Sequence, residues 1–478
     1  MKKFTVRFLA VAIVSLFSLN AFAQSNWVNF VDNQSRLMFN TVDDQEKDMV
    51  VGDLDNDGDD DIIVVRKRPF SVNGPRVNLL LMNEGGNLVD RTSEFTPTFI
   101  SDPDNARDVQ LLDVNNDGWQ DFVVANTFGS LPRLYINLGE IEGEWQGYED
   151  QGSNGEWYSP QFPTSPQCCG LSTGDVNGDD FPDIYFVDYN NSLEARLFIN
   201  NGDNTFSDES VARMSVAART QAFGTTGFLA DMNGDGNLDI VSNDSVAFGG
   251  VGVEVAFNDG KGFFMQTQIL PSAVSYMVRD VDVNNDGRLD IYVVDDLQDY
   301  TLINNSTNAD GTINVSQVFH SASGLTQNFN GNVLPADVDN DGWVDMAVCD
   351  VDVDIPGCNR RFALLRNNGG NNFTDPNNSV NPLSWNLQGS HDMVWIDINK
   401  DSNLDMFIAT CDGFQLLMND AVILLGDVNN DGTVNLLDVN PFVDLLGSGG
   451  FIAQADLNSD GVVNLLDVSG FISVLSGG

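Results

Sequence analysis

Short apolar runs recur along the chain, and each run comes directly after a loop rich in Asp, Asn and Gly. Ile, Val, Phe and Met dominate these runs, as is typical of buried β-strands. The loops begin at intervals of 51 to 62 residues, and such a recurrence indicates a repeat architecture. The seven runs occupy residues 62–65, 122–125, 184–187, 240–241, 291–294, 346–348 and 406–409.

Each repeat carries further strand signals on both sides of this run. A second apolar run ends in an Asn-Gly turn, as at residues 196–202 and 362–369, and Asn-Gly favours a hairpin because both residues tolerate positive φ. A short outer strand follows, as at 206–208 and 373–375. Together with the apolar strand before each loop, this makes four strands per repeat, the unit of a propeller blade. The sequence therefore predicts an all-β fold, a seven-bladed β-propeller over residues 24–420.

The seventh repeat lacks an outer strand of its own, since residues 414–418 run almost directly into Asp427. Residues 27–32 resemble the outer strands at 87–90 and 204–208. We expect the mature N-terminus to pair onto the seventh blade and close the ring. Such closure removes two exposed sheet edges.

The acidic loops share the nine-residue pattern Asp-x-Asp/Asn-x-Asp-Gly-x-x-Asp, with Asp180 and Ser402 in place of Gly in two of them. Positions 1, 3, 5 and 9 can bring side-chain oxygens to one point, and Gly at position 6 permits the turn that adds the carbonyl of position 7. Hard oxygen ligands without His or Cys favour calcium over magnesium, which needs a smaller and more rigid octahedron. Asp, Asn and Gly also populate ordinary turns, but seven loops in phase favour up to seven calcium ions.

The predicted propeller ligands are those at positions 1, 3, 5 and 9 of each loop. They are Asp53, Asp55, Asp57 and Asp61; Asp113, Asn115, Asp117 and Asp121; Asp175, Asn177, Asp179 and Asp183; Asp231, Asn233, Asp235 and Asp239; Asp282, Asn284, Asp286 and Asp290; Asp337, Asp339, Asp341 and Asp345; and Asp397, Asn399, Asp401 and Asp405.

These repeats resemble the FG-GAP/VCBS family, best known from the propellers of integrin α-subunits and from many secreted bacterial proteins. The resemblance covers roughly residues 26–420. It implies a propeller and calcium binding. It does not select an activity, because propellers serve adhesins, lectin-like modules and polysaccharide lyases alike.

A second, duplicated calcium motif follows, and it predicts a small α-helical, EF-hand-like domain over residues 421–478. A short helix should follow each loop, at 439–446 and 468–475. This part resembles a type I dockerin, in which positions 1, 3, 5, 9 and 12 bind calcium, giving two more ions. The corresponding residues are Asp427, Asn429, Asp431, Asn435 and Asp438, and Asp456, Asn458, Asp460, Asn464 and Asp467.

The dockerin resemblance also implies a cohesin-like partner, contacted through positions 10 and 11 of each loop. Those positions often hold a hydroxyl or small residue in the family, whereas this chain has Leu436-Leu437 and Leu465-Leu466. Two interpretations follow. The leucine pairs either contact the partner or form the core of the module itself.

Charge and targeting signals place the protein outside the cytoplasm. Residues 1–23 combine Lys2, Lys3 and Arg7 with an apolar stretch and the sequence Ala21-Phe22-Ala23, which predicts a cleaved signal peptide. The formal charge of -48 disfavours nucleic acid and anionic lipid as partners. No other stretch is long and apolar enough to span a bilayer. We expect a secreted monomer, with the periplasm or cell surface as alternatives.

Five cysteines would enter this oxidising compartment, namely Cys168, Cys169, Cys349, Cys358 and Cys411. A bridge between Cys349 and Cys358 would close one short loop, and we expect it on that ground. The odd number leaves the remaining pairing open.

In related propellers ligands bind the face opposite the metal loops. On that face we expect Lys47, Arg107 and His391, each followed by an acid, at the mouth of the axial channel. Arg forks suit carboxylate or sulfate groups, which suggests an anionic glycan. Neutralisation of neighbouring Asp residues is the alternative. The candidate ligand residues are Arg66, Lys67, Arg68, Arg76, Arg107, Arg360 and Arg361.

The long connection between repeats two and three contains four aromatic residues, Trp145, Tyr148, Trp157 and Tyr158. Exposed aromatic rings in a long loop can stack on sugars. Packing over the edge of a blade is the commoner fate of such residues, and both possibilities stay open.

The sequence contains few residues or motifs that indicate a catalytic site. The chain has two histidines and lacks a nucleophile elbow, a zinc His pair and a phosphate-binding Gly loop. For a calcium-assisted polysaccharide lyase, the candidates are His391, Arg107 and Tyr276. A glycoside hydrolase is a further possibility, although no carboxylate pair is distinguished. A secreted binding or adhesion module for a glycan or protein is favoured over a polysaccharide-cleaving enzyme, and a docked scaffold component ranks third.

Overall fold

A computed structural model shows the arrangement of most of the chain. It describes residues 28–43, 46–67, 75–127, 131–152, 168–188, 194–220, 224–244, 252–272, 275, 277–294, 299–306, 311–320, 332–349, 362–374, 389–420, 425–429, 434–448, 451–458 and 462–476. The described chain forms two compact units, Phe30–Asn419 and a unit that includes Asp420–Gly478. The predicted signal peptide lies outside the described residues.

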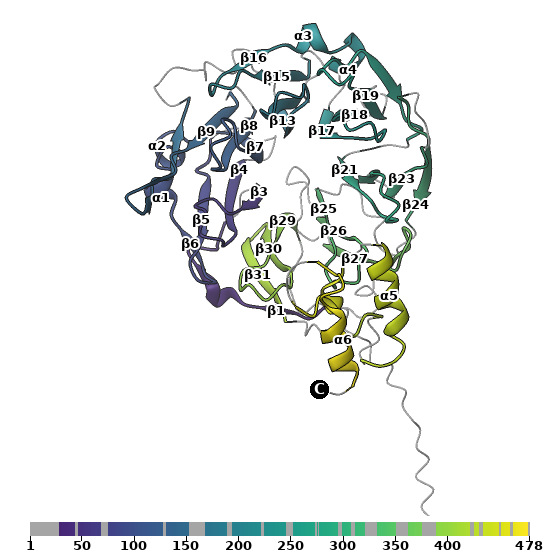
Figure 1. The fold of residues 1–478 in the computed structure, drawn as a ribbon. Helices are drawn as coiled ribbons and strands as arrows, with labels where there is room; N and C mark the ends of the chain where they lie inside the picture. Colours follow the sequence, from purple (N-terminus) through teal and green to yellow (C-terminus); the bar gives the residue numbers. More distant parts are fainter. Residues whose placement is uncertain are drawn as a thin grey trace, which may run out of the picture. The chain divides into compact units, whose positions relative to one another are not determined.

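The larger unit is a ring of seven antiparallel sheets, as predicted, and Figure 1 shows the sheets arranged around a centre. The innermost strands are β3 (Glu46–Gly52), β7 (Ala106–Leu112), β13 (Cys168–Gly174), β17 (Gly224–Ala230), β21 (Met277–Val281), β25 (Asn332–Ala336) and β29 (Ser390–Ile396). Each leads through an acidic loop into a second strand. The second strands are β4 (Asp61–Lys67), β8 (Asp121–Asn126), β14 (Asp183–Asp188), β18 (Asp239–Asp244), β22 (Asp290–Val294), β26 (Asp345–Cys349) and β30 (Asp405–Thr410).

Two further strands complete each blade. The third strands are β5 (Leu79–Asn83), β9 (Arg133–Asn137), β15 (Arg196–Asn200), β19 (Gly252–Phe257), β23 (Tyr300–Asn304), β27 (Ala363–Asn367) and β31 (Gly413–Asn419). The outer strands are β6 (Leu88–Asp90), β12 (Tyr148–Asp150), β16 (Phe206–Asp208), β20 (Gln266–Ile269), β24 (Val315–Phe319), β28 (Phe373–Thr374) and β1 (Phe30–Asp32).

The ring closes with the N-terminal strand, which confirms the expectation from the seventh repeat. β1 pairs antiparallel with β31, placing Phe30 opposite Asn419 and Asp32 opposite Leu417. The seventh sheet therefore has the order β1-β31-β30-β29. Phe30 also stacks on Trp395 of β29, with ring centroids 6.4 Å apart.

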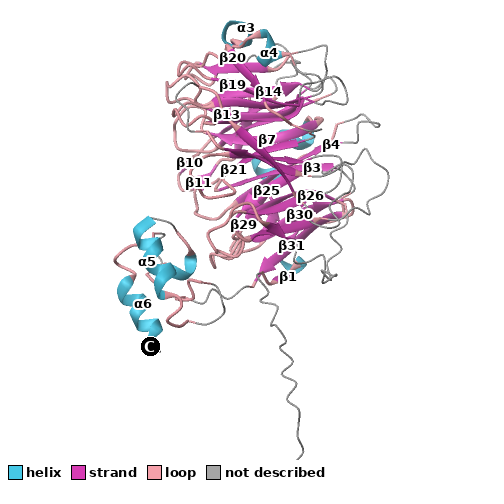
Figure 2. Ribbon diagram, turned by 90° about the vertical axis from the view of Figure 1, so that its right-hand side faces the viewer, coloured by secondary structure: helices cyan, strands magenta, loops and turns pink. Residues whose placement is uncertain are grey.

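The propeller also contains short strands and short helices outside the four main strands of each blade. β2 (Leu37–Met38) adds a parallel strand to β6, and β10 (Glu140–Ile141) pairs with β11 (Glu144–Trp145). The short helices are η1 (Gln34–Arg36), α1 (Thr92–Phe95), α2 (Thr98–Ser101), α3 (Ser210–Arg213) and α4 (Val216–Arg219). Figure 2 shows α3 and α4 in cyan beside the magenta strands of the blades.

The hydrophobic core lies between neighbouring blades, because the second strands are buried on both faces. Ile63 and Val65 pack toward Phe122 of the second blade, whereas Ile62 and Val64 pack toward Phe407 of the seventh. Alternate side chains of one strand point to opposite faces of its sheet. This explains why the second strands read as continuous apolar runs rather than as alternating ones.

The C-terminal unit contains the two predicted helices, α5 (Val439–Ser448) and α6 (Val468–Leu475), with η3 (Ala453–Ala455) between them. Phe442 and Phe471, one from each helix, stack with ring centroids 3.9 Å apart. The duplicated halves therefore share one small core, which also includes Val428, Ile452 and Val463.

Candidate functional site

All seven acidic loops of the propeller fold in the same way. The carboxylate at position 1 accepts a hydrogen bond from the backbone N–H at position 6, at 2.8 to 3.0 Å, and so closes the turn. These bonds run from Gly58, Gly118, Asp180, Gly236, Gly287, Gly342 and Ser402 to Asp53, Asp113, Asp175, Asp231, Asp282, Asp337 and Asp397 respectively. The repetition of one bond in seven places shows that the motif specifies a loop geometry.

The backbone enters the left-handed region at position 6 of each loop. Gly58 has φ 84° and Gly342 has φ 85°. The two exceptions to Gly keep this conformation, since Asp180 has φ 70° and Ser402 has φ 71°. Non-glycine residues adopt this region only at a cost in free energy. Position 4 is also left-handed, as at Asn56 with φ 57°, which the sequence reading missed.

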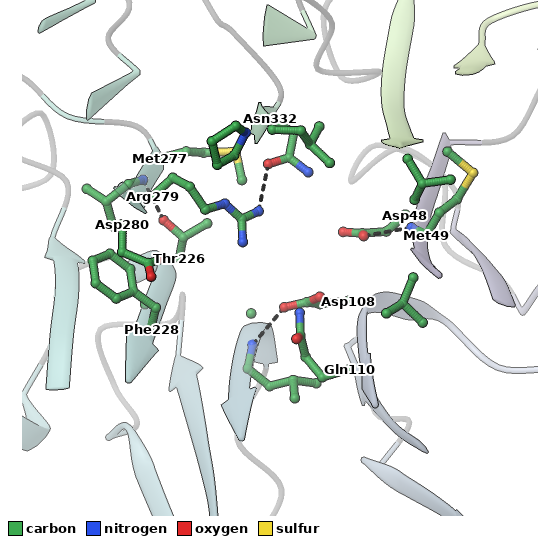
Figure 3. Close-up of a pocket in the computed structure, with 18 of the residues that line it drawn as sticks. Asp48, Met49, Asp108, Gln110, Thr226, Phe228, Met277, Arg279, Asp280 and Asn332 are labelled. Atoms are coloured by element: carbon green, nitrogen blue, oxygen red, sulfur yellow. Dashed lines mark hydrogen bonds between the residues drawn. The ribbon is translucent and has the colours of Figure 1, made fainter. Parts of the chain in front are cut away.

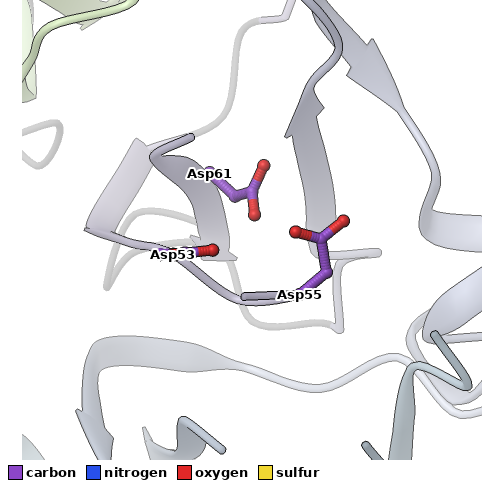
Figure 4. Close-up of side chains that lie close together, drawn as sticks. All are labelled: Asp53, Asp55 and Asp61. Carbon is purple, nitrogen blue, oxygen red and sulfur yellow. The ribbon is translucent and has the colours of Figure 1, made fainter. Parts of the chain in front are cut away.

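The loops bring carboxylates together in a way that fits a hard cation. Asp53, Asp55 and Asp61 each offer an oxygen within 4.8 Å of the others, and Figure 4 shows these side chains facing one space. Asp337, Asp339 and Asp345 form an equivalent cluster. The other five loops have Asn at position 3, so that an amide oxygen stands where a third carboxylate would be.

The electrostatics of these clusters favour a bound cation. Burial raises the pKa of Asp61 to about 8, and burial together with repulsion from Asp339 raises the pKa of Asp345 to about 9. In the part of the chain that the structure describes, Oδ1 of Asp53 is buried without a hydrogen-bond donor. A divalent cation with oxygen preference would satisfy these groups, and the donor chemistry matches calcium.

The Asp at position 9 has a second role, because it fixes the third strand of its own blade. Asp183 accepts hydrogen bonds from the N–H of Val176 at 3.0 Å and of Asn200 at 2.8 Å. Asn200 then donates through Nδ2 to the carbonyl of Val114 in the preceding blade at 2.8 Å. Each acidic loop is thereby tied to a neighbouring blade.

This inter-blade bond occurs seven times and forms a ring that the sequence reading missed. The donors all end a third strand, and the acceptors all occupy position 2 of the preceding loop. They pair Asn83 with Ile398, Asn137 with Leu54, Asn200 with Val114, Asn258 with Val176, Asn304 with Met232, Asn367 with Val283 and Asn419 with Val338.

The sixth loop differs from the others, because a guanidinium reaches its ligand positions. Arg366 of β27 lies 2.6 Å from Oδ2 of Asp339 and 3.0 Å from Oδ2 of Asp341. The corresponding residue is apolar in the other six blades, as with Met82 and Ile136. Position 3 and position 5 of this loop therefore have a cationic neighbour within the chain.

In the C-terminal unit the Asp at position 12 organises each loop. Asp438 accepts hydrogen bonds from the N–H of Asn429 at 3.0 Å and of Asn435 at 2.7 Å. Asp467 makes the equivalent pair of bonds, to Asn458 and Asn464. The two loops therefore share the same hydrogen-bond pattern. The predicted ligands Asp431 and Asp460 lie outside the described residues.

The leucine pairs of these loops face solvent. Leu436 and Leu437 are 82% and 66% exposed, and Leu465 and Leu466 are 80% and 68% exposed. The interpretation that these leucines form the core of the module is therefore wrong, since Phe442 and Phe471 supply it. Two equivalent apolar pairs remain available for a partner.

The structure describes the side chains of three predicted ligand residues, Arg66, Arg76 and Arg107. Arg66 and Arg76 line a cavity of about 560 Å³ together with Asp43, and Arg66 pairs with Asp43 at 2.6 Å. Arg107 is instead buried, at 5% exposure. The side chains of Lys67, Arg68, Arg360 and Arg361 lie outside the described part of the chain.

Of the predicted catalytic residues, the structure describes His391 and Arg107, and both are buried. His391 is 5% exposed, and its Nε2 lies 3.4 Å from Sγ of Cys411. Tyr276 and the side chain of Lys47 fall outside the described residues. The other histidine, His320, lies between Tyr292 and Phe373, and burial lowers its pKa to about 4. Both histidines are therefore buried.

The aromatic residues of the long connection pack on the second blade where they are described. Tyr148 is buried in β12 and donates its hydroxyl to the carbonyl of Gln120 at 3.0 Å. Trp145 packs against Phe95, with ring centroids 4.6 Å apart. Trp157 and Tyr158 lie outside the described residues.

The cysteine pairing differs from the expected one. Cys349 keeps a thiol within the buried strand β26, so the predicted bridge to Cys358 is wrong. Cys411 forms a disulfide, and the side chain of its partner is not among those described. A close spacing along the chain was a poor guide here, because β26 orients Cys349 into the core between blades.

Comparison with known proteins identifies both parts of the chain. The FG-GAP-like repeat matches residues 53–124, 113–186, 175–242 and 282–348, which together make up more than half of the sequence. The chain belongs to the FG-GAP-like repeat family. Each match begins at the first Asp of an acidic loop, so the family's repeat and the loop described above coincide. A dockerin type I domain matches residues 425–476.

Several known proteins are similar to parts of this FG-GAP protein. Integrin alpha-6 of Gallus gallus is 28% identical over 160 residues, which cover 31% of this chain and 14% of the integrin. Among solved structures, an Agrocybe aegerita lectin that recognises non-reducing terminal N-acetylglucosamine covers 77% of this chain and 86% of its own, with 17% identity and a TM-score of 0.45. BBS1N in complex with ARL6DN covers 82% and 98%, with 10% identity and a TM-score of 0.45.

These family memberships bear on cofactor and location. FG-GAP repeats and dockerin domains generally bind calcium, which agrees with the acidic clusters found here. Both are typical of extracellular proteins. Over the described residues, no helix has the length and apolar character needed to cross a membrane.

Proposed function

We propose that this FG-GAP protein is an extracellular propeller that attaches to a cohesin-type partner through its C-terminal dockerin module. The observation that carries the proposal is the pair of exposed leucine dipeptides, Leu436-Leu437 and Leu465-Leu466, at equivalent positions of the duplicated loops. Apolar side chains this exposed, on one small module, mark a surface that a partner covers. The partner surface should be apolar at its centre, as is typical of protein interfaces.

Calcium is part of this proposal, because each leucine pair directly follows position 9 of a loop. The N–H of Leu437 donates to Oδ1 of Asn435 at 2.8 Å, and the N–H of Leu466 donates to Oδ1 of Asn464 at 2.8 Å. The predicted ligands of the C-terminal loops would therefore also orient the leucines. In the propeller, the residues at positions 1, 3, 5 and 9 would hold up to seven further ions.

Substitution of the leucines tests the docking surface. The full chain with all four leucines changed to Ser should lose binding to immobilised cohesin domains in calcium by about a hundredfold, since buried apolar anchors dominate interface energy. Changing one pair at a time reports whether each half binds on its own. Phe451→Ser, which alters an exposed apolar residue outside both loops, should leave binding unchanged. Equal binding by the four-leucine variant and the parent would contradict the proposal.

A second candidate function concerns the propeller, and one observation favours it. Among the described lining residues of the cavity beside Arg66 and Arg76, two cationic groups face one carboxylate, that of Asp43, in a chain of formal charge -48. Such a cavity suits a sulfate or uronate group. We propose it as a binding site for an anionic polysaccharide.

The double variant Arg66→Ala with Arg76→Ala tests this second function. It should weaken binding to a sulfated polysaccharide about tenfold, as expected for loss of charge-assisted hydrogen bonds. Arg91→Ala, at an exposed site in another part of the first blade, serves as the charge-matched control. If the double variant and the control bind equally well, the site lies elsewhere.

A further inference from the structure

A cavity of about 430 Å³ lies at the centre of the propeller, where the seven innermost strands meet. Every innermost strand contributes to its lining, including Asp48 of β3, Asp108 of β7, Phe228 of β17 and Arg279 of β21. Figure 3 shows the side chains of Asp48, Asp108 and Arg279 reaching toward the same space from different blades. This cavity is separate from the acidic loops and from the cavity beside Arg66.

Charged groups of opposite sign face each other across this space without pairing. Arg279 donates from Nε to the carbonyl of Val333 at 3.3 Å and from Nη2 to Oδ1 of Asn332 at 3.2 Å. Its positive charge lowers the pKa of both Asp48 and Asp108, but among the described residues no salt bridge joins Arg279 to either carboxylate. A ligand that spans the cavity could therefore contact both signs of charge.

The balance of charge in the cavity favours a cationic group. Burial, with repulsion from Asp392 and Asp108, raises the pKa of Asp48 well above its ordinary value, and burial also raises the pKa of Asp108. Asp392 is held by the N–H of Met49 at 2.9 Å and by Nδ2 of Asn332 at 2.7 Å. A positive charge placed between Asp48 and Asp108 would relieve this repulsion.

The remaining walls suit an organic cation better than a metal ion. The cavity is lined by Met49, Met277, Phe228 and Trp395, which offer apolar and aromatic contact. The groups of described acids that converge closely enough for a metal are in the first and sixth loops, not here. Aliphatic stems pack on such walls while the charged end stays with the carboxylates.

We propose that the central cavity binds a primary ammonium group on an aliphatic stem, with a carboxylate or carbonyl acceptor at the other end. The ammonium would lie between Asp48 and Asp108, and the acceptor would face Arg279. Two sources share this chemistry, a free ω-amino acid and a lysine side chain of a protein. The proposal is independent of the docking function, because it uses none of the residues of the C-terminal unit.

Calorimetry on the full chain in saturating calcium tests the proposal with three matched small molecules. The probe 5-aminopentanoate carries both charges, pentylamine lacks the carboxylate and pentanoate lacks the amine. We expect saturable binding of 5-aminopentanoate and about tenfold weaker binding of pentanoate, because a charge-assisted hydrogen bond to the cavity acids is lost. Nα-acetyl-lysine N-methylamide identifies the source, since tighter binding of this probe than of 5-aminopentanoate indicates a protein lysine.

Two variants assign the charges. Asp48→Asn keeps an oxygen that can accept the hydrogen bond from the N–H of Met49. This variant should bind 5-aminopentanoate about tenfold more weakly than the parent. Arg279→Gln should weaken the binding of 5-aminopentanoate but leave the binding of pentylamine unchanged. Glu149→Gln, an exposed acid on β12, controls for the change in net charge and should have no effect.

Three results would overturn the proposal: no saturable binding of either amine, equal binding of pentanoate and 5-aminopentanoate, or an Asp48→Asn variant with unchanged affinity. If the melting curve shows that Asp48→Asn does not fold, the binding of the three small molecules to the parent chain still tests the proposal.

Discussion

At the scale of single residues, the acidic loop combines metal ligation with backbone geometry. Position 1 closes the turn and position 9 anchors the third strand, so the same carboxylates that converge on one point also shape the blade. Left-handed φ at position 6 explains the recurrence of Gly there. Asp180 and Ser402 show that the loop geometry persists when Gly is absent.

Ser402 gives a test of this strain. Ser402→Gly should stabilise the propeller by about 0.5–1 kcal/mol, because relief of left-handed strain exceeds the added entropy of Gly in the unfolded chain. Ser316→Gly, at an exposed position in β24, should destabilise by about the same amount. Chemical denaturation in saturating calcium measures both, and two changes of the same sign would contradict the argument.

The inter-blade Asn residues give a second test at this scale. Asn200 is buried and bonds the carbonyls of Val114 at 2.8 Å and Pro182 at 3.1 Å. Asn200→Ala should therefore lower the free energy of unfolding by about 2–4 kcal/mol, since it leaves buried polar groups unsatisfied. Its exposed neighbour Asn201 offers a control, and Asn201→Ala should cost less than about 1 kcal/mol. Similar costs for the two variants would show that the inter-blade bond contributes little.

At the scale of elements, the sequence predicted strands far better than contacts between blades. The apolar run after each loop matches the second strand of its blade, from β4 in the first blade to β30 in the seventh. These strands are buried on both faces and therefore read as continuous apolar runs. The ring of Asn residues was not predictable in this way, since Asn304 and its partner Met232 are 72 residues apart. The sequence predicted Asp48 and Asp108 at the mouth of the axial channel, but it did not predict Arg279 there. Asp48, Asp108 and Arg279 meet only because the ring closes.

Closure by the N-terminal strand was predictable, because the seventh repeat lacked a strand that residues 27–32 could supply. Val31→Pro should destabilise the propeller by about 3 kcal/mol, because Pro removes a backbone donor from β1, opposite Met418. Val31→Ser keeps the donor at the same half-exposed position and should cost under about 1 kcal/mol. Thermal melts compare the two, and equal destabilisation would mean that β1 does not hold the ring closed.

At the scale of the whole molecule, the protein comprises a propeller and a docking module that use acidic loops for related purposes. In the propeller the loops join neighbouring blades, and in the C-terminal unit they accept hydrogen bonds from the backbone of the exposed residues Leu437 and Leu466. The sequence predicted both units from the loops alone, whereas the exposure of Leu436 and Leu465 required the structure. The ligand face stays a prediction, and the structure adds that Arg107 is buried.

We propose that calcium in the acidic loops holds the blades together. Calorimetric melting of the full chain in excess calcium and in EDTA tests this role of calcium, with bound ions counted by equilibrium dialysis. We predict about nine ions per chain and a fall of more than about 10 °C in the melting temperature of the propeller in EDTA, because ligands that bind only the folded state stabilise it. An unchanged melting temperature would show that calcium does not hold the blades together.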